Sequence, residues 1–296
     1  MRVLRFLLSG WLFACFASAT FAQDQTRVIA VNYPLQYFAQ RLLGDTAEVV
    51  FPVPEGVDPS FWRPSIADIS MIQSSDLILL NGAGFATWVD RVSLPRSKVI
   101  NTSASIEDQF IITESITHSH GDGGEHSHEG LASYTWLDPS LASAQAQAIA
   151  NAVIARGLAP EDAVNQRLEA LRRDLDALDL RASQAVGVLA GQHIIATHPR
   201  YEYFARRHDL SLSSLAWEAG AVPNEAEISD LRALVAKTKA TLLIWEATPP
   251  SGAFEFAEEL GLQNIIFDPL AHGIDGQSFF EAYDTSLSAI AALEDQ

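Results

Sequence analysis

The stretch Val164-Asn-Gln-Arg-Leu168-Glu-Ala-Leu171-Arg-Arg-Asp-Leu175-Asp-Ala-Leu178 decides how this chain is divided. Its apolar residues recur at alternating intervals of four and three, a pattern that Ala182, Ala185 and Leu189 continue. This spacing puts them on one face of a long amphipathic helix, and charged residues fill the other faces. A coiled-coil dimer would suit the same pattern. We favour packing within the chain, because flanking α/β lobes need cover for their apolar faces.

On both sides of this helix, short β-branched runs alternate with helical patterns. The predicted strands are 28–32, 47–52, 76–81, 98–101, 192–197, 241–245 and 265–267. Helices are predicted at 34–43, 140–156 and 201–208, and two more begin at capping boxes, Ser65 with Asp68 and Asn224 with Glu227. This alternation is typical of parallel strands joined by crossover helices. We therefore predict an α/β fold of two lobes, 27–157 and 191–296, each with a mostly parallel sheet flanked by helices and joined by one rigid helix within 158–190.

The first 22 residues have the pattern of a secretory signal peptide. A short basic start is followed by an apolar run too brief to span a bilayer, and Thr20-Phe21-Ala22 supplies small residues at the positions a signal peptidase reads. We expect cleavage before Gln23 and a periplasmic protein. Leu12-Phe-Ala-Cys15 also resembles a lipoprotein cleavage site, although Phe13 is bulky for one. Cys15 is the only cysteine, so the mature chain would bind metal only through nitrogen and oxygen.

The net charge of the chain limits the kinds of partner that it can bind. It has 37 acidic and 19 basic residues, for a formal net charge of −18. This balance argues against nucleic acid or an anionic membrane surface as a partner and suits a cationic ligand. No stretch after the signal segment is long and apolar enough to be a transmembrane helix, so any membrane role must come through a partner. We expect the protein to be a monomer.

The segment 118–129 holds four of the eight histidines, His118, His120, His126 and His128. They form two His-Ser-His pairs around a glycine-rich turn. Neutral imidazole is the commonest protein ligand for transition metals, so we interpret the segment as a loop that collects metal. The alternative is a solvated linker without a binding role.

Three side chains follow predicted strands directly. His198 comes after 192–197, Glu246 after 241–245 and Asp268 after 265–267. Ligands of open parallel sheets bind beyond the carboxyl ends of the strands, so His198 and Asp268 are candidate metal ligands. A lone histidine here is also compatible with a purely structural role. Glu246 is suited to orienting a ligand or to capping a helix.

Several motifs together resemble those of the solute-binding receptors of zinc and manganese ABC uptake systems, the ZnuA/TroA-like family. The resemblance runs from about Val28 to the C-terminal helix. It rests on Gly56-Val-Asp-Pro59 with Pro64-Ser-Ile-Ala-Asp68, Asp76-Leu-Ile-Leu-Leu-Asn-Gly82 with Trp88, Trp136-Leu-Asp-Pro139, Thr197-His-Pro-Arg-Tyr-Glu-Tyr-Phe204 and Phe267-Asp-Pro-Leu270. It implies a receptor that captures a divalent metal between two lobes and passes it to an ABC permease and its ATPase in the inner membrane.

The resemblance also implies four metal ligands, of which this chain keeps two. His198 and Asp268 have the family's ligand types, whereas the other two positions carry Ser60 and Tyr134. Serine is a poor ligand at neutral pH, and Tyr134 would have to lose a proton with a reference pKa near 10. The implied cargo is zinc, with manganese or iron as alternatives.

Three explanations of these departures remain open. Loop histidines such as His126 and His128 complete a zinc site; or Tyr134, His198 and Asp268 form an oxygen-rich site for a harder ion such as ferric iron; or the cleft takes a ligand other than a bare metal and the loop only buffers metal. We favour the first.

An enzyme is the least favoured class. His118-Ser-His120-Gly-Asp122 fits the start of a dinuclear zinc hydrolase motif, but position 123 is Gly where that motif needs histidine. The chain has no Gly-x-Ser-x-Gly elbow, phosphate loop or dinucleotide fingerprint. We therefore expect no catalytic residues.

Overall fold

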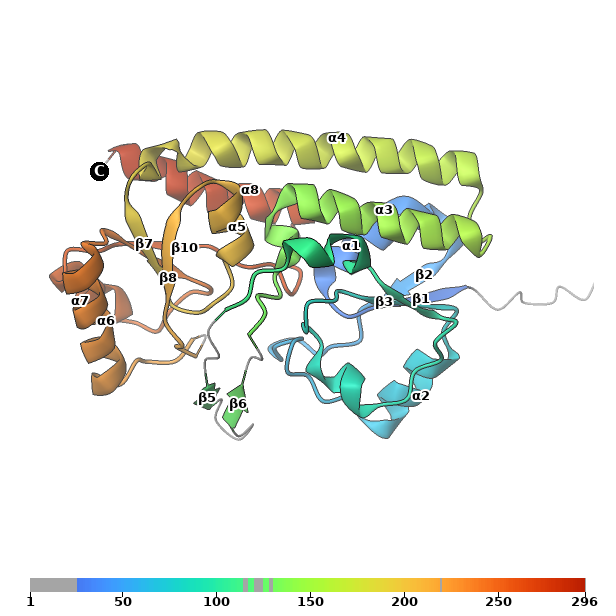
Figure 1. Ribbon diagram of the computed structural model, residues 1–296, viewed down its shortest axis with the longest axis horizontal. Coiled ribbons are helices and arrows are strands. Elements are labelled where there is room, and N and C mark those ends of the chain that lie inside the picture. The colour runs from blue at the N-terminus through green and yellow to red at the C-terminus, as the bar shows by residue number, and fades with distance from the viewer. Residues whose placement is uncertain (1–25, 114–116, 120–124, 128–129, 219, 296) are drawn as a thin grey trace, which may run out of the picture.

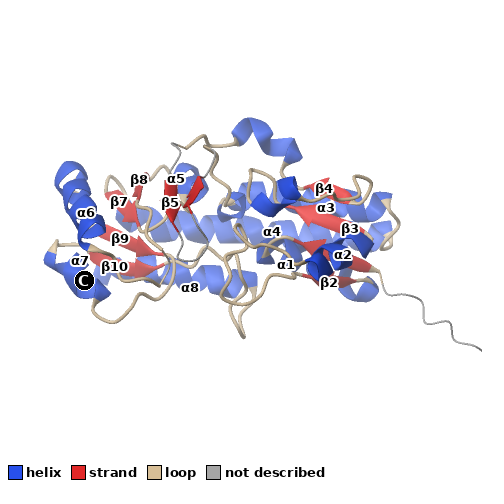
Figure 2. Ribbon diagram, turned by 90° about the horizontal axis from the view of Figure 1, so that it is seen from below, coloured by secondary structure: helices blue, strands red, loops and turns tan. Residues whose placement is uncertain are grey.

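The computed structural model describes residues 26–113, 117–119, 125–127, 130–218 and 220–295. The predicted signal peptide, with Cys15, lies outside these ranges, as do His120 and His128. The described chain forms two α/β lobes at opposite ends of an elongated molecule (Figure 1). Seen from below, the two sheets lie apart with loops between them (Figure 2). The predicted fold class is confirmed.

The N-terminal lobe contains a parallel sheet in the order β2-β1-β3-β4. Its strands are β1 (Arg27–Ala30), β2 (Glu48–Val50), β3 (Leu77–Leu80) and β4 (Val99–Asn101). Its helices are α1 (Tyr33–Leu43), α2 (Ile66–Ser74) and α3 (Pro139–Ala155). The predicted capping box of α2 is present, because Ser65 and Asp68 each accept a hydrogen bond from the other's backbone N–H.

The C-terminal lobe repeats this plan with a parallel sheet in the order β10-β9-β7-β8. Its strands are β7 (His193–Ala196), β8 (Ser211–Ser214), β9 (Leu242–Trp245) and β10 (Gln263–Ile266). Its helices are α5 (Glu202–Arg207), α6 (Glu225–Thr238), α7 (Ala253–Glu259) and α8 (Phe279–Ala291). β8 was not predicted, because Ser-Leu-Ser-Ser has the composition of a turn. It is a strand because it pairs with β7 along its whole length.

The predicted long helix is α4 (Glu161–Ala185), which runs along one side of the molecule over both lobes (Figure 1). The regular helix ends at Ala185, and Leu189 lies in a following 3-10 turn, Val186–Leu189. The predicted apolar face is buried throughout and belongs to one continuous core with residues of both sheets. Each buried leucine there contributes about 2 kcal/mol through removal of apolar area from water. This face is covered within the chain and is not available to a coiled-coil partner.

The histidine segment contains a short antiparallel hairpin where only a loop was predicted. β5 (Thr117–Ser119) pairs with β6 (Glu125–Ser127), and His118 lies opposite His126 in the register. Only a loop was predicted because the glycine-rich, polar composition of the segment gives no sign that the residues on either side of the turn pair as strands. The hairpin projects from the middle of the molecule, on the side away from α4 (Figure 1).

Among the helices that the structure describes, none is both long and apolar enough to cross a membrane.

Candidate functional site

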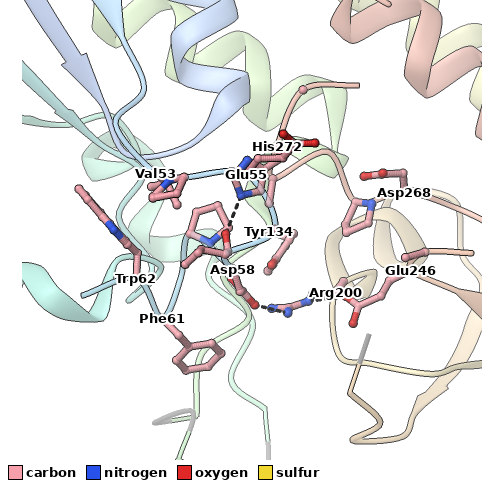
Figure 3. Close-up of a pocket in the computed structure, with 18 of the residues that line it drawn as sticks. Val53, Glu55, Asp58, Phe61, Trp62, Tyr134, Arg200, Glu246, Asp268 and His272 are labelled. Carbon is pink, nitrogen blue, oxygen red and sulfur yellow. Dashed lines mark hydrogen bonds and ion pairs between the residues drawn. The ribbon is translucent and has the colours of Figure 1, made fainter. Parts of the chain in front are cut away.

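A cavity of about 1270 Å³ lies between the two lobes. The N-terminal lobe supplies the loop after β2 and the segment around Tyr134, and the C-terminal lobe supplies residues that follow β7, β9 and β10. Figure 3 shows the side chains that line it, with Asp58, Tyr134 and Arg200 near its centre. The cavity is much larger than a single bare metal ion.

Ser60 lies at the N-terminal wall but is turned toward its own loop. Its hydroxyl donates a hydrogen bond to Asp58 Oδ1 at 2.6 Å, and its backbone N–H donates to the same oxygen at 2.8 Å. The backbone N–H and hydroxyl of Thr87 donate to the Ser60 carbonyl and fix the loop. Ser60 is buried, and its described role is to hold the Asp58 carboxylate in place.

Tyr134 forms the floor of the cavity and is 2% exposed. It precedes a 3-10 turn, Thr135–Leu137, and its ring packs against Phe85 and Trp136. The neighbouring Ser133 carbonyl accepts a hydrogen bond of 2.9 Å from Asn81 Nδ2, which lies at the end of β3. Burial raises the pKa of Tyr134 well above its ordinary value, so the side chain is a neutral phenol at pH 7.

His198 follows β7 and is fully buried. Its Nδ1 lies 2.6 Å from the Trp217 carbonyl oxygen, and the Trp217 N–H donates to the Thr197 carbonyl at the end of β7. A carbonyl oxygen only accepts, so Nδ1 carries the proton and Nε2 is the basic nitrogen. A backbone carbonyl that fixes the tautomer in this way is typical of metal-binding histidines.

Asp268 follows β10 and lines the cavity. Its Oδ1 accepts a hydrogen bond of 2.7 Å from the Leu270 N–H. Burial raises the pKa of Asp268, and the hydrogen bond from Leu270 and the nearby His272 offset part of that rise. The carboxylate is thus held in a defined position at an electrostatic cost, which a bound cation would relieve.

Sequence reasoning missed Arg200, which lies at the centre of the cleft (Figure 3). The side chain is 5% exposed; its Nη2 lies 2.7 Å from Asp58 Oδ2, and its Nε lies 3.0 Å from Glu246 Oε2. The guanidinium carbon lies 4.5 Å from the centre of the Tyr134 ring. The only local signal for Arg200 is its position two residues after the candidate ligand His198, in the same motif.

The charges around Arg200 are strongly coupled. Burial raises the pKa of Asp58, but Arg200 and the hydrogen bonds from Ser60 outweigh it and bring the value to about 2. Burial raises the pKa of Glu246 more than Arg200 lowers it. Glu246, which was predicted to orient a ligand, thus contacts Arg200 through Oε2. Its other oxygen, Oε1, lies 3.8 Å from His198 Nδ1.

The structure brings together only part of the predicted site. Tyr134 and Asp268 line the cavity with Glu246, whereas His198 and Ser60 are buried in its walls. Within the described ranges, no three His, Cys, Asp or Glu side chains are arranged to hold a metal ion. Of the loop histidines, the backbones of His118 and His126 are paired in the hairpin.

Hydrogen bonds across the cleft fix the loop after β10 on the N-terminal lobe. The Trp136 indole N–H donates to the Pro269 carbonyl at 2.8 Å, and the Tyr33 N–H donates to the Ala271 carbonyl at 3.1 Å. His272 Nε2 lies 2.6 Å from the Val57 carbonyl oxygen. Asp268 belongs to this loop, so its position depends on both lobes.

Known proteins share this sequence pattern and fold. A family model described as ZnuA, the periplasmic component A of a zinc-uptake complex, matches residues 28–293. The zinc-binding lipoprotein AdcA of Streptococcus pneumoniae is 23% identical over 99% of this chain, which spans 60% of the length of AdcA. The high-affinity zinc uptake protein ZnuA of Bacillus subtilis is 22% identical, with 86% of this chain and 81% of that protein covered.

Solved structures share the fold. The Zn(II)-bound ZnuA-like domain of Streptococcus pneumoniae AdcA superposes with a TM-score of 0.74 at 19% identity, covering 92% of this chain and all of that domain. FpvC of Pseudomonas aeruginosa, in complex with Mn²⁺, superposes with a TM-score of 0.73 at 20% identity over 92% of this chain and 99% of FpvC. Since the family model matches nearly the whole described chain, the protein belongs to the ZnuA family of zinc-uptake components.

Proposed function

We propose that this chain is the solute-binding component of an ABC importer for a divalent transition metal, with zinc as its cargo. The observation that carries the proposal is His198, a family ligand position whose tautomer is fixed by the Trp217 carbonyl so that Nε2 is the coordinating nitrogen. The family match and the relatives named for zinc support the choice of metal.

In this proposal, His198 and Asp268 hold the metal, with Tyr134 and Ser60 at the other two family positions and Glu246 orienting the ligands. A neutral phenol and a hydroxyl bind zinc weakly, so the cleft alone offers two good ligands. The loop histidines His118, His120, His126 and His128 would supply the missing imidazoles. The hairpin register supports this, because it places the backbones of His118 and His126 directly opposite each other.

The proposed partners are a membrane permease and its ATPase, which would receive the metal from a monomeric receptor. The receptor would work in the periplasm after removal of residues 1–22, or on a lipid anchor at Cys15 as in relatives named lipoproteins. Its task is capture and release, so it makes and breaks no covalent bond. The family is made up of transport proteins rather than enzymes.

Zinc titration of the metal-free protein by calorimetry tests the proposal. The variants are His198→Ala, a deletion of residues 118–129, and His193→Gln as a matched control. His193 begins β7, the strand that precedes His198, and contacts Ser213 away from the cavity. We expect one tight equivalent and weaker additional binding in the wild type. His198→Ala should lose the tight equivalent, the deletion should lose the additional binding and weaken the tight site, and His193→Gln should change neither.

The same titration has a clear opposing result. If zinc affinity survives His198→Ala and disappears with the loop deletion, the cleft is not the primary site and the loop alone binds metal.

A second candidate is a cleft adapted to a harder, oxygen-preferring ion such as ferric iron. The buried phenol of Tyr134 beside Asp268 favours it, because such ions prefer oxygen ligands. Ferric iron bound to a phenolate absorbs visible light. A visible band that appears on adding ferric citrate, and that is lost in Tyr134→Phe, would favour this candidate over zinc.

A further inference from the structure

Arg200 bridges the two lobes inside the cleft, where the proposed metal would also lie between the lobes. Asp58 comes from the N-terminal lobe and Glu246 from the C-terminal lobe, and the guanidinium contacts both at 2.7 and 3.0 Å. Arg200 and Glu246 are buried, and Asp58 is partly buried. The protein therefore carries a cation of its own between the carboxylates of the cleft.

The two substituted ligand positions both support this arginine. The Ser60 hydroxyl and N–H hold Asp58 Oδ1, which leaves Oδ2 facing Arg200. The face of the Tyr134 ring receives the guanidinium at 4.5 Å, a favourable cation–π distance. A histidine at position 60 would lack this hydroxyl contact. The departures at Ser60 and Tyr134 thus form one structural unit with Arg200, rather than two separate losses.

A fixed positive charge in this position opposes a second cation. Charges inside a protein interact much more strongly than in water, and a divalent ion near Asp268 or Glu246 would lie close to the guanidinium. Such an ion would also compete with Arg200 for Glu246. Arginine does not lose its proton in proteins, so this opposition persists at every physiological pH.

We infer that Arg200 is a specificity-determining residue: its guanidinium takes the place of a cation between Asp58 and Glu246, so zinc binds the cleft only in competition with it. This inference rests on the proposed metal-binding function. It predicts that the cleft of the wild type binds zinc more weakly than the same cleft without the charge.

The test measures zinc affinity by competition with a chromophoric chelator, in a background that lacks residues 118–129 so that only the cleft reports. Arg200→Met removes the charge and keeps most of the volume; Arg200→Lys keeps the charge. Arg63→Met is the matched control, because Arg63 lines the same cavity and its loss changes the net charge equally. We expect Arg200→Met to bind zinc about tenfold more tightly or better. Arg200→Lys should stay near the parent, and Arg63→Met should change affinity much less.

Arg200→Met leaves the buried Glu246 and the partly buried Asp58 without their cation and is at risk of not folding. The double variant Arg200→Met with Asp58→Asn removes one of these charges as well. It should fold and still bind zinc more tightly than the parent carrying Asp58→Asn alone. Circular dichroism and thermal melts establish that each variant is folded.

A double-mutant experiment distinguishes direct competition between Arg200 and zinc from a general effect of charge on zinc affinity. Tyr134→His restores an imidazole at a family ligand position. Its gain in zinc affinity should be small with Arg200 present and clearly larger with Arg200→Met, a non-additivity expected for groups that compete for one site. Equal gains in the two backgrounds would count against the inference.

Two results overturn different claims. If folded Arg200→Met binds zinc no more tightly than the parent, Arg200 does not compete with metal and the inference is wrong. The proposed function would still stand in that case, provided that zinc binding is lost in His198→Ala. If neither the parent nor any variant shows zinc binding that depends on His198, the proposed function itself fails.

Discussion

The two walls of the cleft hold their side chains in different ways. On the C-terminal wall, His198, Glu246 and Asp268 each follow a parallel strand, and the backbone pairing of β7, β9 and β10 fixes where those strands end. On the N-terminal wall, Ser60 and Tyr134 lie on loops without a strand directly before them. The proposed ligands His198 and Asp268 lie on the wall built on strand ends, and the two substituted positions lie on the wall built on loops.

A buried polar network replaces strand ends as the support of the N-terminal wall. Asn81 Nδ2 donates to the Ser133 carbonyl at 2.9 Å, and its Oδ1 accepts from Gln145 at 3.0 Å and from Asn32 at 3.2 Å. Gln145 also donates to Thr102 Oγ1 at 3.0 Å. These groups are buried, so each depends on its neighbours for hydrogen bonds.

The largest loss of stability is expected from a substitution that removes the centre of this hydrogen-bond network. Asn81→Leu would leave the Ser133 carbonyl, Gln145 and Asn32 buried without these partners, at about 1–3 kcal/mol for each unsatisfied group. We expect a loss of about 3 kcal/mol or more in the free energy of unfolding, measured by urea denaturation. Asn151→Leu on the exposed surface of α3 is the matched control and should cost under about 0.5 kcal/mol. A loss below about 1 kcal/mol for Asn81→Leu would mean that the network does not support this wall.

The next effect concerns the charge that joins the walls. Asp58 has a pKa of about 2, against 3.8 for the free group, because of Arg200 and Ser60. A carboxylate with a lowered pKa stabilises the fold above pH ~4, and this contribution of about 2 kcal/mol is lost as the pH falls toward 2. Asp58→Asn should therefore be less stable at pH 7 and should lose less stability than the wild type between pH 4 and 2.

Urea unfolding at a series of pH values measures this difference. Asp45→Asn serves as the control, because Asp45 is exposed, and it should follow the wild-type curve. If Asp58→Asn and the wild type lose stability in parallel between pH 4 and 2, the ion pair with Arg200 does not stabilise the fold as described.

The sequence predicts the secondary structure and fold of this protein better than the side-chain contacts in its cleft. The parallel strands and α4 follow from local periodicity, because apolar spacing directly reflects which face is buried. The positions of His198 and Asp268 after strands were predictable for the same reason, since a strand end is a local feature. β8 was missed because its strand conformation depends on pairing with β7 rather than on its own residues.

Arg200 could not be placed from the sequence because its partners are distant along the chain. Asp58 precedes it by 142 residues and Glu246 follows it by 46. Ser60 and Tyr134 appeared as two lost ligands, and only the packing reveals that both contact the same ion pair. Long-range charge pairing leaves no periodic pattern, so local reasoning recognises the substitutions but not what they support.

The smallest expected effect concerns a single hydrogen bond on the C-terminal wall. The Tyr201 hydroxyl donates to the Phe267 carbonyl at 2.5 Å, directly before Asp268. Tyr201→Phe removes this bond but leaves the backbone pairing of β10 with β9, which also locates Asp268. We expect a loss of about 1 kcal/mol in unfolding free energy and only a small change in zinc affinity. Tyr37→Phe, whose hydroxyl contacts Arg41 near the surface, is the control. If Tyr201→Phe cost as much as Asn81→Leu, both walls would depend equally on buried side-chain hydrogen bonds. Strand ends would then not explain why the proposed ligands His198 and Asp268 lie on the C-terminal wall.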